Sequence, residues 1–132
     1  MSRFQNKVAL VTGSTQGIGE AVARRLAAEG ASGVVVCGRN LERGAAVVAA
    51  LRDMGSEAHF IPVELGSADS CKALIAKTDE IFGRIDVLVN AAGLSLRGSI
   101  VDTTVELWDT LMNVNVRAPF LLMQGGDRNN AA

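Results

Sequence analysis

The glycine-rich segment TGSTQGIG, residues 12–19, constrains the fold of this chain more than any other stretch. It follows the apolar run 8–11, which is typical of a strand buried on both faces, and it precedes residues with helical periodicity. Such a segment is either an ordinary strand-to-helix turn or a binding site for a phosphate. The flanking elements favour the phosphate site, because the free N–H groups and the dipole at a helix N-terminus attract anions.

Each glycine of this G-x-x-x-G-x-G pattern has a predicted role. Gly13 turns sharply off the strand with a positive φ, Gly17 has no side chain to hold a pyrophosphate away, and Gly19 lets the helix lie close to the sheet. Ser14 and Thr15 add hydroxyl donors. The spacing differs from the common G-x-G-x-x-G motif, and no Lys-Ser or Lys-Thr pair follows the last glycine as in a P-loop.

Strands and helices alternate along the rest of the chain. The strands are predicted at the apolar runs 8–11, 33–37, 58–63 and 85–89, with amphipathic helices between them and after the last. The order β-α-β-α-β-α-β-α indicates an α/β fold with a parallel sheet and helices on both of its faces. We expect one domain, residues 1–124.

Local signals predict where the later helices begin and end. Ser67 is expected to cap the third helix and Gly83 to end it. Thr103 and Glu106 form a capping box for a fourth helix, which is predicted to run to about Met123. The polar residues 125–132 predict a disordered tail.

Composition argues against several classes of function. The chain is 48% hydrophobic and 20% charged, which is a globular balance. A net charge of −1 without a basic stripe argues against binding to nucleic acid. The first apolar run is too short for a signal peptide or a membrane span, so we expect a soluble, cytoplasmic protein with no membrane partner. Cys37, Cys71 and the lone His59 have neither disulfide-framework nor metal-site spacing, and His59 is expected to pack within a strand.

Arg39 predicts which dinucleotide the chain would bind. It lies 20 residues after Gly19, near the end of the second strand, where dinucleotide-binding folds place the residue that contacts the adenosine ribose. No Asp or Glu occurs between Gly30 and Leu41 to bind a 2′-hydroxyl group. A guanidinium group suits a 2′-phosphate, so NADP(H) is favoured over NAD(H). The alternative is a solvated surface arginine.

Three motifs together resemble the short-chain dehydrogenase/reductase (SDR) family, over its N-terminal cofactor-binding half. They are T-G-x-x-x-G-I-G at 12–19, N-A-A-G at 90–93, and Asn115 in the helix that follows. The resemblance runs from about Lys7 to Met123 and implies the first half of a Rossmann-type, doubly wound sheet with strand order 3-2-1-4. Glu64 and Leu65 fall where the family usually has Asp and a small apolar residue beside the adenine. The implied cofactor-binding residues are Gly13, Ser14, Thr15, Gln16, Gly17, Ile18, Gly19, Arg39, Glu64, Leu65, Asn90, Ala91, Ala92 and Gly93.

Asn115 matches the asparagine whose backbone carbonyl holds a water of the proton relay in the family, an auxiliary catalytic role. Pro119 lies four residues later and has no N–H, so the Asn115 carbonyl loses its normal helical partner and a local kink is expected. The alternative is a plain kink in a core helix. The family's other catalytic groups are a Tyr, a Lys four residues after it, and a Ser; this chain contains no tyrosine and no Y-x-x-x-K motif.

Two functions therefore remain open. The first is the NADP(H)-binding part of an SDR whose longer parent transfers hydride between nicotinamide and a small carbonyl or alcohol substrate. These residues alone would then be a truncated, inactive form, because a positioned acid–base group supplies about 10²–10⁴-fold in rate. The second is a non-catalytic dinucleotide-binding module or partner subunit. The fourth strand would present a bare apolar edge, which predicts self-association.

Overall fold

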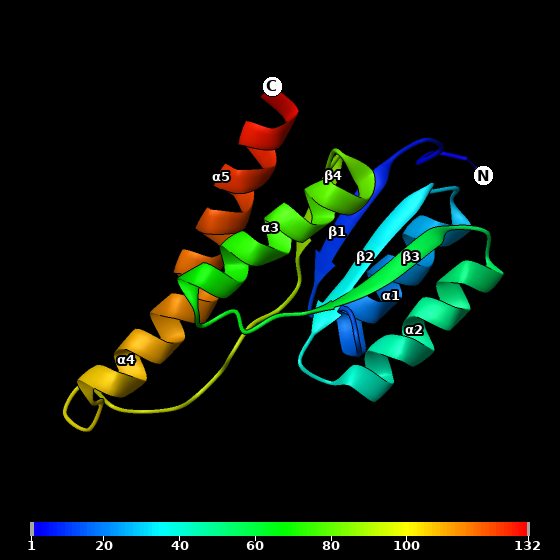
Figure 1. The fold of residues 1–132 in the computed structure, drawn as a ribbon. Coiled ribbons are helices and arrows are strands. Elements are labelled where there is room, and N and C mark those ends of the chain that lie inside the picture. The colour runs from blue at the N-terminus through cyan, green and yellow to red at the C-terminus, as the bar shows by residue number, and fades with distance from the viewer. Residues whose placement is uncertain (1, 132) are drawn as a thin grey trace.

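Four parallel strands form one sheet at the centre of the chain (Figure 1). They are β1 (Val8–Thr12), β2 (Gly33–Gly38), β3 (Glu57–Pro62) and β4 (Val87–Asn90), in the order β3-β2-β1-β4. The computed structural model describes residues 2–131, and it confirms the predicted α/β fold and strand order. Within the described residues β4 pairs with β1 alone and lies at the border of the sheet. Self-association through that edge stays a prediction.

Helices cover both faces of the sheet (Figure 1). The helices α1 (Gly17–Ala28) and α2 (Leu41–Asp53) lie on one face, and α3 (Ala68–Phe82) and α5 (Ala118–Ala131) on the other. The chain crosses from β1 to β2 and β3 in one direction, and then returns past β1 to β4. This reversal places a crevice beyond the carboxyl end of β1, where ligands of such folds bind.

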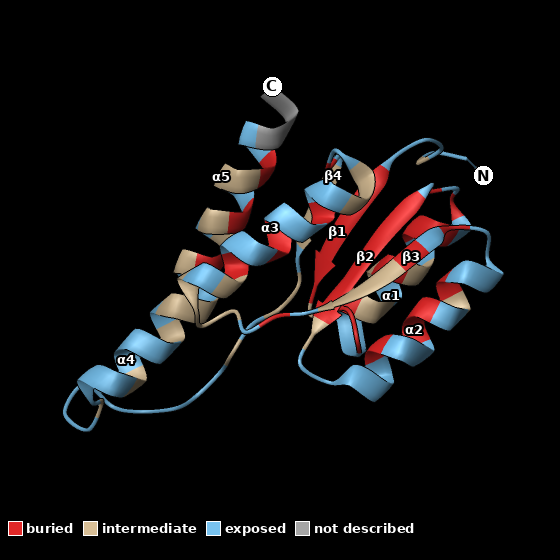
Figure 2. Cartoon of the chain, in the orientation of Figure 1, coloured by how far each residue is buried: buried red, intermediate tan, exposed pale blue. Residues whose placement is uncertain are grey.

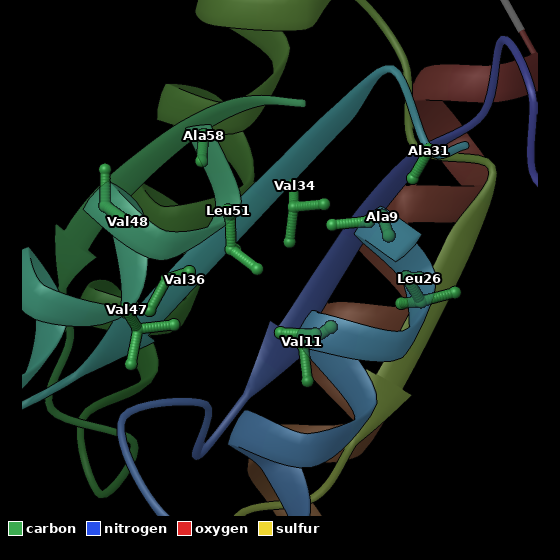
Figure 3. Packing of buried hydrophobic residues seen from close by; sticks show 12 residues of the cluster. Ala9, Val11, Leu26, Ala31, Val34, Val36, Val47, Val48, Leu51 and Ala58 are labelled. Carbon is green, nitrogen blue, oxygen red and sulfur yellow. The ribbon is translucent and has the colours of Figure 1, made fainter. Parts of the chain in front are cut away.

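The side chains of β1 explain why the core has two halves. All five residues of this strand are buried, as Figure 2 shows, so both faces of the strand must be apolar. Ala9 and Val11 pack with Leu26 of α1 and Leu51 of α2 (Figure 3). Leu10 points the other way and joins the cluster formed with α3 and α5.

The ends of α3 follow the predicted signals, whereas the start of the next helix is shifted by one residue. The Ser67 hydroxyl accepts a hydrogen bond from the Ser70 N–H at 3.2 Å, and Gly83 ends α3 with φ 74°. Helix α4 (Val105–Met112) is capped by Thr104 and not by Thr103. The Thr103 hydroxyl instead donates to the Ser99 carbonyl at 2.5 Å and so stabilises the preceding turn. The predicted capping box is therefore wrong, because a neighbouring threonine takes the cap.

The last helical segments form one long rod (Figure 1). Between α4 and α5 lies the π-helix η1 (Asn113–Arg117), where the Ala118 N–H donates to the Asn113 carbonyl. Pro119 predicted an irregularity at this place, since it cannot donate to the Asn115 carbonyl. The expected disordered tail 125–132 is not observed: α5 continues to Ala131, and residue 132 lies outside the described residues. A Cβ built on Gly125 would lie 3.0 Å from Ile75, so this part of α5 packs against α3 despite its polar sequence.

Candidate functional site

A cleft of about 770 Å³ opens at the carboxyl ends of the strands. Its volume falls in the range of about 300–1,000 Å³ that is typical of small-molecule sites. Five segments of the chain form its walls: the glycine segment, the three loops that follow β2, β3 and β4, and the rod near the α4–η1 junction. The lining residues are Gly13, Thr15, Gln16, Gly17, Ile18, Gly19, Gly38, Arg39, Val63, Glu64, Leu65, Gly66, Ser67, Ala91, Ala92, Gly93, Leu94, Thr110, Asn113 and Val114.

The three glycines of the first loop meet three different steric demands. Gly13 has φ 61°, and a Cβ built there would lie 2.8 Å from the Cα of Ala92. A Cβ on Gly19 would lie 2.1 Å from the Gly13 carbonyl oxygen, so only glycine lets α1 begin this close to β1. Gly17 has φ 60°, and its missing Cβ would point into open space. These three geometries agree with the predicted roles of a turn, an open approach for a ligand and close packing of the helix.

The start of α1 is suited to hold an anion. Its N-cap residue, Gln16, makes no side-chain hydrogen bond to the first turn of the helix. The Gln16 amide oxygen instead accepts from the guanidinium group of Arg43 in α2. The N-terminal N–H groups of α1 therefore lack the usual side-chain cap and face the cleft beside Gly17, where the helix dipole favours negative charge.

Ser14 does not line the cleft, contrary to its predicted role as a hydroxyl donor. The side chain is fully buried, and its hydroxyl donates to the Val11 carbonyl at 2.7 Å and accepts from the Cys37 N–H at 3.0 Å. These bonds join the end of β1 to the end of β2. The loop turns its serine inward and its neighbour Thr15 toward the cleft.

Removing the Ser14 hydroxyl is expected to lower stability with little effect on ligand affinity. In Ser14→Ala the buried Cys37 N–H loses its acceptor, which costs about 1–3 kcal/mol in the free energy of unfolding. Urea unfolding followed by circular dichroism measures this loss, and calorimetric titration with NADPH measures affinity. A variant as stable as the wild type, with weakened binding, would instead place the hydroxyl against the ligand.

Charged side chains of opposite sign lie on two walls of the cleft. Arg39 follows β2 and Glu64 follows β3, and both line the cleft. The Arg39 Nη1 and the Glu64 Oε2 are 3.9 Å apart, with 80% and 58% of the side chains exposed. Such an exposed pair stabilises the fold little. The Arg39 guanidinium group is therefore available to a phosphate. The Glu64 carboxylate would compete with that phosphate for the guanidinium group.

The loop after β4 is fixed by two side chains from distant parts of the sequence. The Ala92 N–H donates to the Thr12 hydroxyl at 3.1 Å. The Asn115 amide oxygen accepts from the Leu94 N–H at 2.9 Å, and its Nδ2 donates to the Leu94 carbonyl at 2.8 Å. Asn115 thus binds the loop backbone through its side chain. Neither Asn90 nor Asn115 lines the cleft itself, whereas Ala91, Ala92 and Gly93 do.

Besides Gly38 and Leu94, the predicted site omitted two groups of lining residues. The first, Val63, Gly66 and Ser67, follows β3, and the rule that ligands bind beyond the carboxyl ends of parallel strands could have found it. The second comprises Thr110, Asn113 and Val114, on the rod. No local pattern marks these three, because their place in the cleft depends on how the rod packs against the loops.

The surroundings of the two cysteines and of His59 indicate structural roles for these residues. Burial raises the pKa of the Cys37 thiol to about 12, and burial also raises that of Cys71 more than the nearby Arg117 charge lowers it. His59 lies 2.9 Å from Glu57 and packs edge-on against Phe82. No group of three or more potential metal ligands occurs among the described residues. Within the described part of the chain, no helix is long and apolar enough to cross a membrane.

A comparison with protein families decides the family of this chain. The family model described as short chain dehydrogenase matches residues 7–128. The chain belongs to the short chain dehydrogenase family. This agrees with the SDR resemblance of residues 12–19, 90–93 and 115.

The proteins similar to this short chain dehydrogenase are longer than the chain itself. It is 43% identical to a 3beta-hydroxysteroid dehydrogenase of Mediterraneibacter gnavus, over 91% of this chain and 44% of that protein. It is 45% identical to human dehydrogenase/reductase SDR family member 4, over 89% of this chain and 42% of that protein. A crystal structure of a short chain dehydrogenase from Burkholderia cenocepacia in complex with NADP matches with a TM-score of 0.90 and 40% identity, over 96% of this chain and 51% of that one. The chain thus spans about half the length of the relatives it matches.

Proposed function

We propose that these residues form the NADP(H)-binding part of a short chain dehydrogenase. The observation that carries the proposal is the glycine turn, which brings the start of α1 to the cleft and leaves the space beside Gly17 open. A pyrophosphate would bind there, against the N–H groups of the first helical turn. The similar Burkholderia structure, which is a complex with NADP, supports the same choice of ligand.

The other walls of the cleft fit the two ends of a dinucleotide. We propose that Arg39 binds the 2′-phosphate, because a guanidinium group matches a phosphate in charge and geometry. Leu65 and Val114 offer apolar surface to the adenine ring, and Glu64 lies beside them. The nicotinamide ribose would pass along Ala91, Ala92 and Gly93. Thr12 holds the Ala92 N–H, and Asn115 holds the backbone of the next residue, Leu94.

The activity proposed for the whole protein is hydride transfer between nicotinamide and a carbonyl or alcohol group. When bound, NADP(H) would supply or accept the hydride. This chain's residues would bind and orient the cofactor, and the Asn115 carbonyl would hold a water of the proton relay. The SDR resemblance assigns the proton donor to a tyrosine, and the 132 residues contain none. A non-catalytic dinucleotide-binding module is therefore the second candidate function.

Calorimetric titration of the chain with NADPH and NADH tests the cofactor proposal. We expect NADPH to bind with a Kd below about 1 mM and at least about tenfold more tightly than NADH, since the second ligand lacks the phosphate for Arg39. Absence of binding at millimolar NADPH would overturn the proposal. Loss of NADPH absorbance with a panel of aldehydes and ketones measures turnover by these residues alone. Turnover above background would contradict the assignment of the proton donor to a tyrosine.

A further inference from the structure

Arg117 connects the rod to one wall of the cleft. Its Nη2 donates to the Gly66 carbonyl at 2.6 Å, across 51 residues of sequence. Its Nε is buried and has no hydrogen-bond partner among the described residues. A buried donor without a partner is destabilising. The position of the Arg117 guanidinium group therefore costs stability at Nε. It gains one charge-assisted hydrogen bond at Nη2.

The carbonyl that Arg117 binds belongs to the segment that faces Arg39. Residues 63–67 follow β3 and line the cleft. Local bonds shape the segment: the Ser67 N–H donates to the Glu64 carbonyl at 3.0 Å, and the Glu64 N–H donates to the Ser70 hydroxyl at 2.9 Å. These bonds tie the segment to itself and to the start of α3. The Arg117 bond ties it to a second element, η1.

The π-helix η1 contacts both loops that flank the cleft. Asn115 binds the backbone of Leu94 on the loop after β4, and Arg117 binds Gly66 on the loop after β3. Asn113 and Val114, at the start of the same turn, line the cleft directly. Short π-helical turns within α-helices occur frequently at functional sites. Here the turn carries both loop-binding side chains.

We propose that Arg117 is a positioning residue for the adenosine end of the cofactor. It holds the Gly66 carbonyl, and through it the wall formed by residues 63–67, at the distance from Arg39 that a 2′-phosphoadenosine group requires. This inference rests on the proposed NADP(H) site, and it adds a residue of the rod that does not itself touch the ligand.

The test compares three variants of the 132-residue chain by calorimetric titration with 2′,5′-ADP, which carries only the adenosine end. Arg117→Met keeps the length of the side chain and removes its donors, and it is expected to weaken binding about fivefold to thirtyfold. Arg117→Lys restores a cationic donor and is expected to stay within about threefold of the wild type. Arg52→Met is the matched control, because Arg52 binds the Ala58 carbonyl through Nε at 3.0 Å and Nη2 at 2.8 Å, and it does not line the cleft. It is expected to lose stability and to keep its affinity.

Amide hydrogen exchange without ligand gives a second, independent readout. In Arg117→Met the Ser67 amide is expected to exchange faster than in the wild type, whereas amides of β1 keep their rates. Wild-type affinity in folded Arg117→Met would overturn the proposal, and so would equal losses in Arg117→Met and Arg52→Met. If Arg117→Met does not fold, Arg117→Gln takes its place under the same criteria. A wild-type chain that does not bind 2′,5′-ADP would contradict the proposed NADP(H) site, while the exchange rates would still decide whether Arg117 holds the wall.

Discussion

Replacing Gly19 by alanine is expected to abolish NADPH binding and to destabilise the chain. The new Cβ would lie 2.1 Å from the Gly13 carbonyl oxygen and 3.0 Å from that of Thr12. Both are backbone atoms, so no side-chain rotation relieves the overlap. The start of α1 must move away from β1, and overpacking of this kind costs about 1–3 kcal/mol in the free energy of unfolding.

The expected loss of affinity is larger than the loss of stability would suggest. A pyrophosphate is held by N–H groups whose positions are set by the same contact between α1 and β1. A shift of even an ångström misaligns several hydrogen bonds at once, so we expect at least about a hundredfold weaker binding of NADPH, or about 2.7 kcal/mol. Calorimetric titration of the folded variant, at a temperature below its unfolding transition, measures this.

Gly126→Ala is the matched control, since it also adds one methyl group to a buried glycine within a helix. The nearest atom to its Cβ is the Cδ1 of Ile85 at 3.9 Å, an ordinary van der Waals distance. Alanine favours helix over glycine by about 1 kcal/mol, so this variant is expected to be as stable as the wild type or more stable, with unchanged affinity. If Gly19→Ala behaved like Gly126→Ala, the close approach of α1 to β1 would not be what forms the phosphate site.

The fold could be predicted because its signals are local. Buried parallel strands need unbroken apolar runs, and the run of β1 is visible without any knowledge of its neighbours. Ser67 and Gly83 mark the ends of α3 by their own capping chemistry. The same reasoning failed at residues 125–131, where polar composition predicted disorder. Packing against Ile75 of α3 is a tertiary contact, and composition carries no information about it.

The glycine loop of the candidate site was predictable because the backbone determines its shape. The three glycines of residues 12–19 predict a turn. A side chain would be strained by the positive φ of Gly13 and Gly17, and it would overlap backbone atoms at Gly13 and Gly19. The direction of a side chain could not be predicted in this way. Ser14 and Thr15 are adjacent and chemically alike, yet Ser14 is buried between β1 and β2 and Thr15 lines the cleft. No sequence pattern predicted the contact of Arg117 either, because its partner, Gly66, is 51 residues away.

Replacing Arg39 by aspartate is expected to reverse the preference between the two cofactors. The change removes the guanidinium group that would bind the 2′-phosphate and brings a second carboxylate near Glu64, whose Oε2 is 3.9 Å from the Arg39 Nη1. Phosphate and carboxylate then repel each other, so the variant loses an attraction and gains a repulsion. We expect NADPH to bind about a hundredfold more weakly or worse, in line with the loss of a charge-assisted pair. NADH is expected to bind more tightly, because the new carboxylate can accept hydrogen bonds from its 2′-hydroxyl.

Arg97→Asp makes the same change of net charge at a residue that does not line the cleft. It is expected to weaken NADPH binding only slightly, and 0.5 M salt should remove most of that effect, because distant charges are screened. The loss in Arg39→Asp is expected to persist at this salt concentration, since a direct contact is screened much less. Equal losses in the two variants would mean that overall charge, and not a contact with Arg39, selects the phosphorylated cofactor. Unchanged preference in Arg39→Asp would mean that another cation binds the 2′-phosphate. One candidate is Arg43, whose guanidinium group contacts Gln16, a lining residue of the cleft.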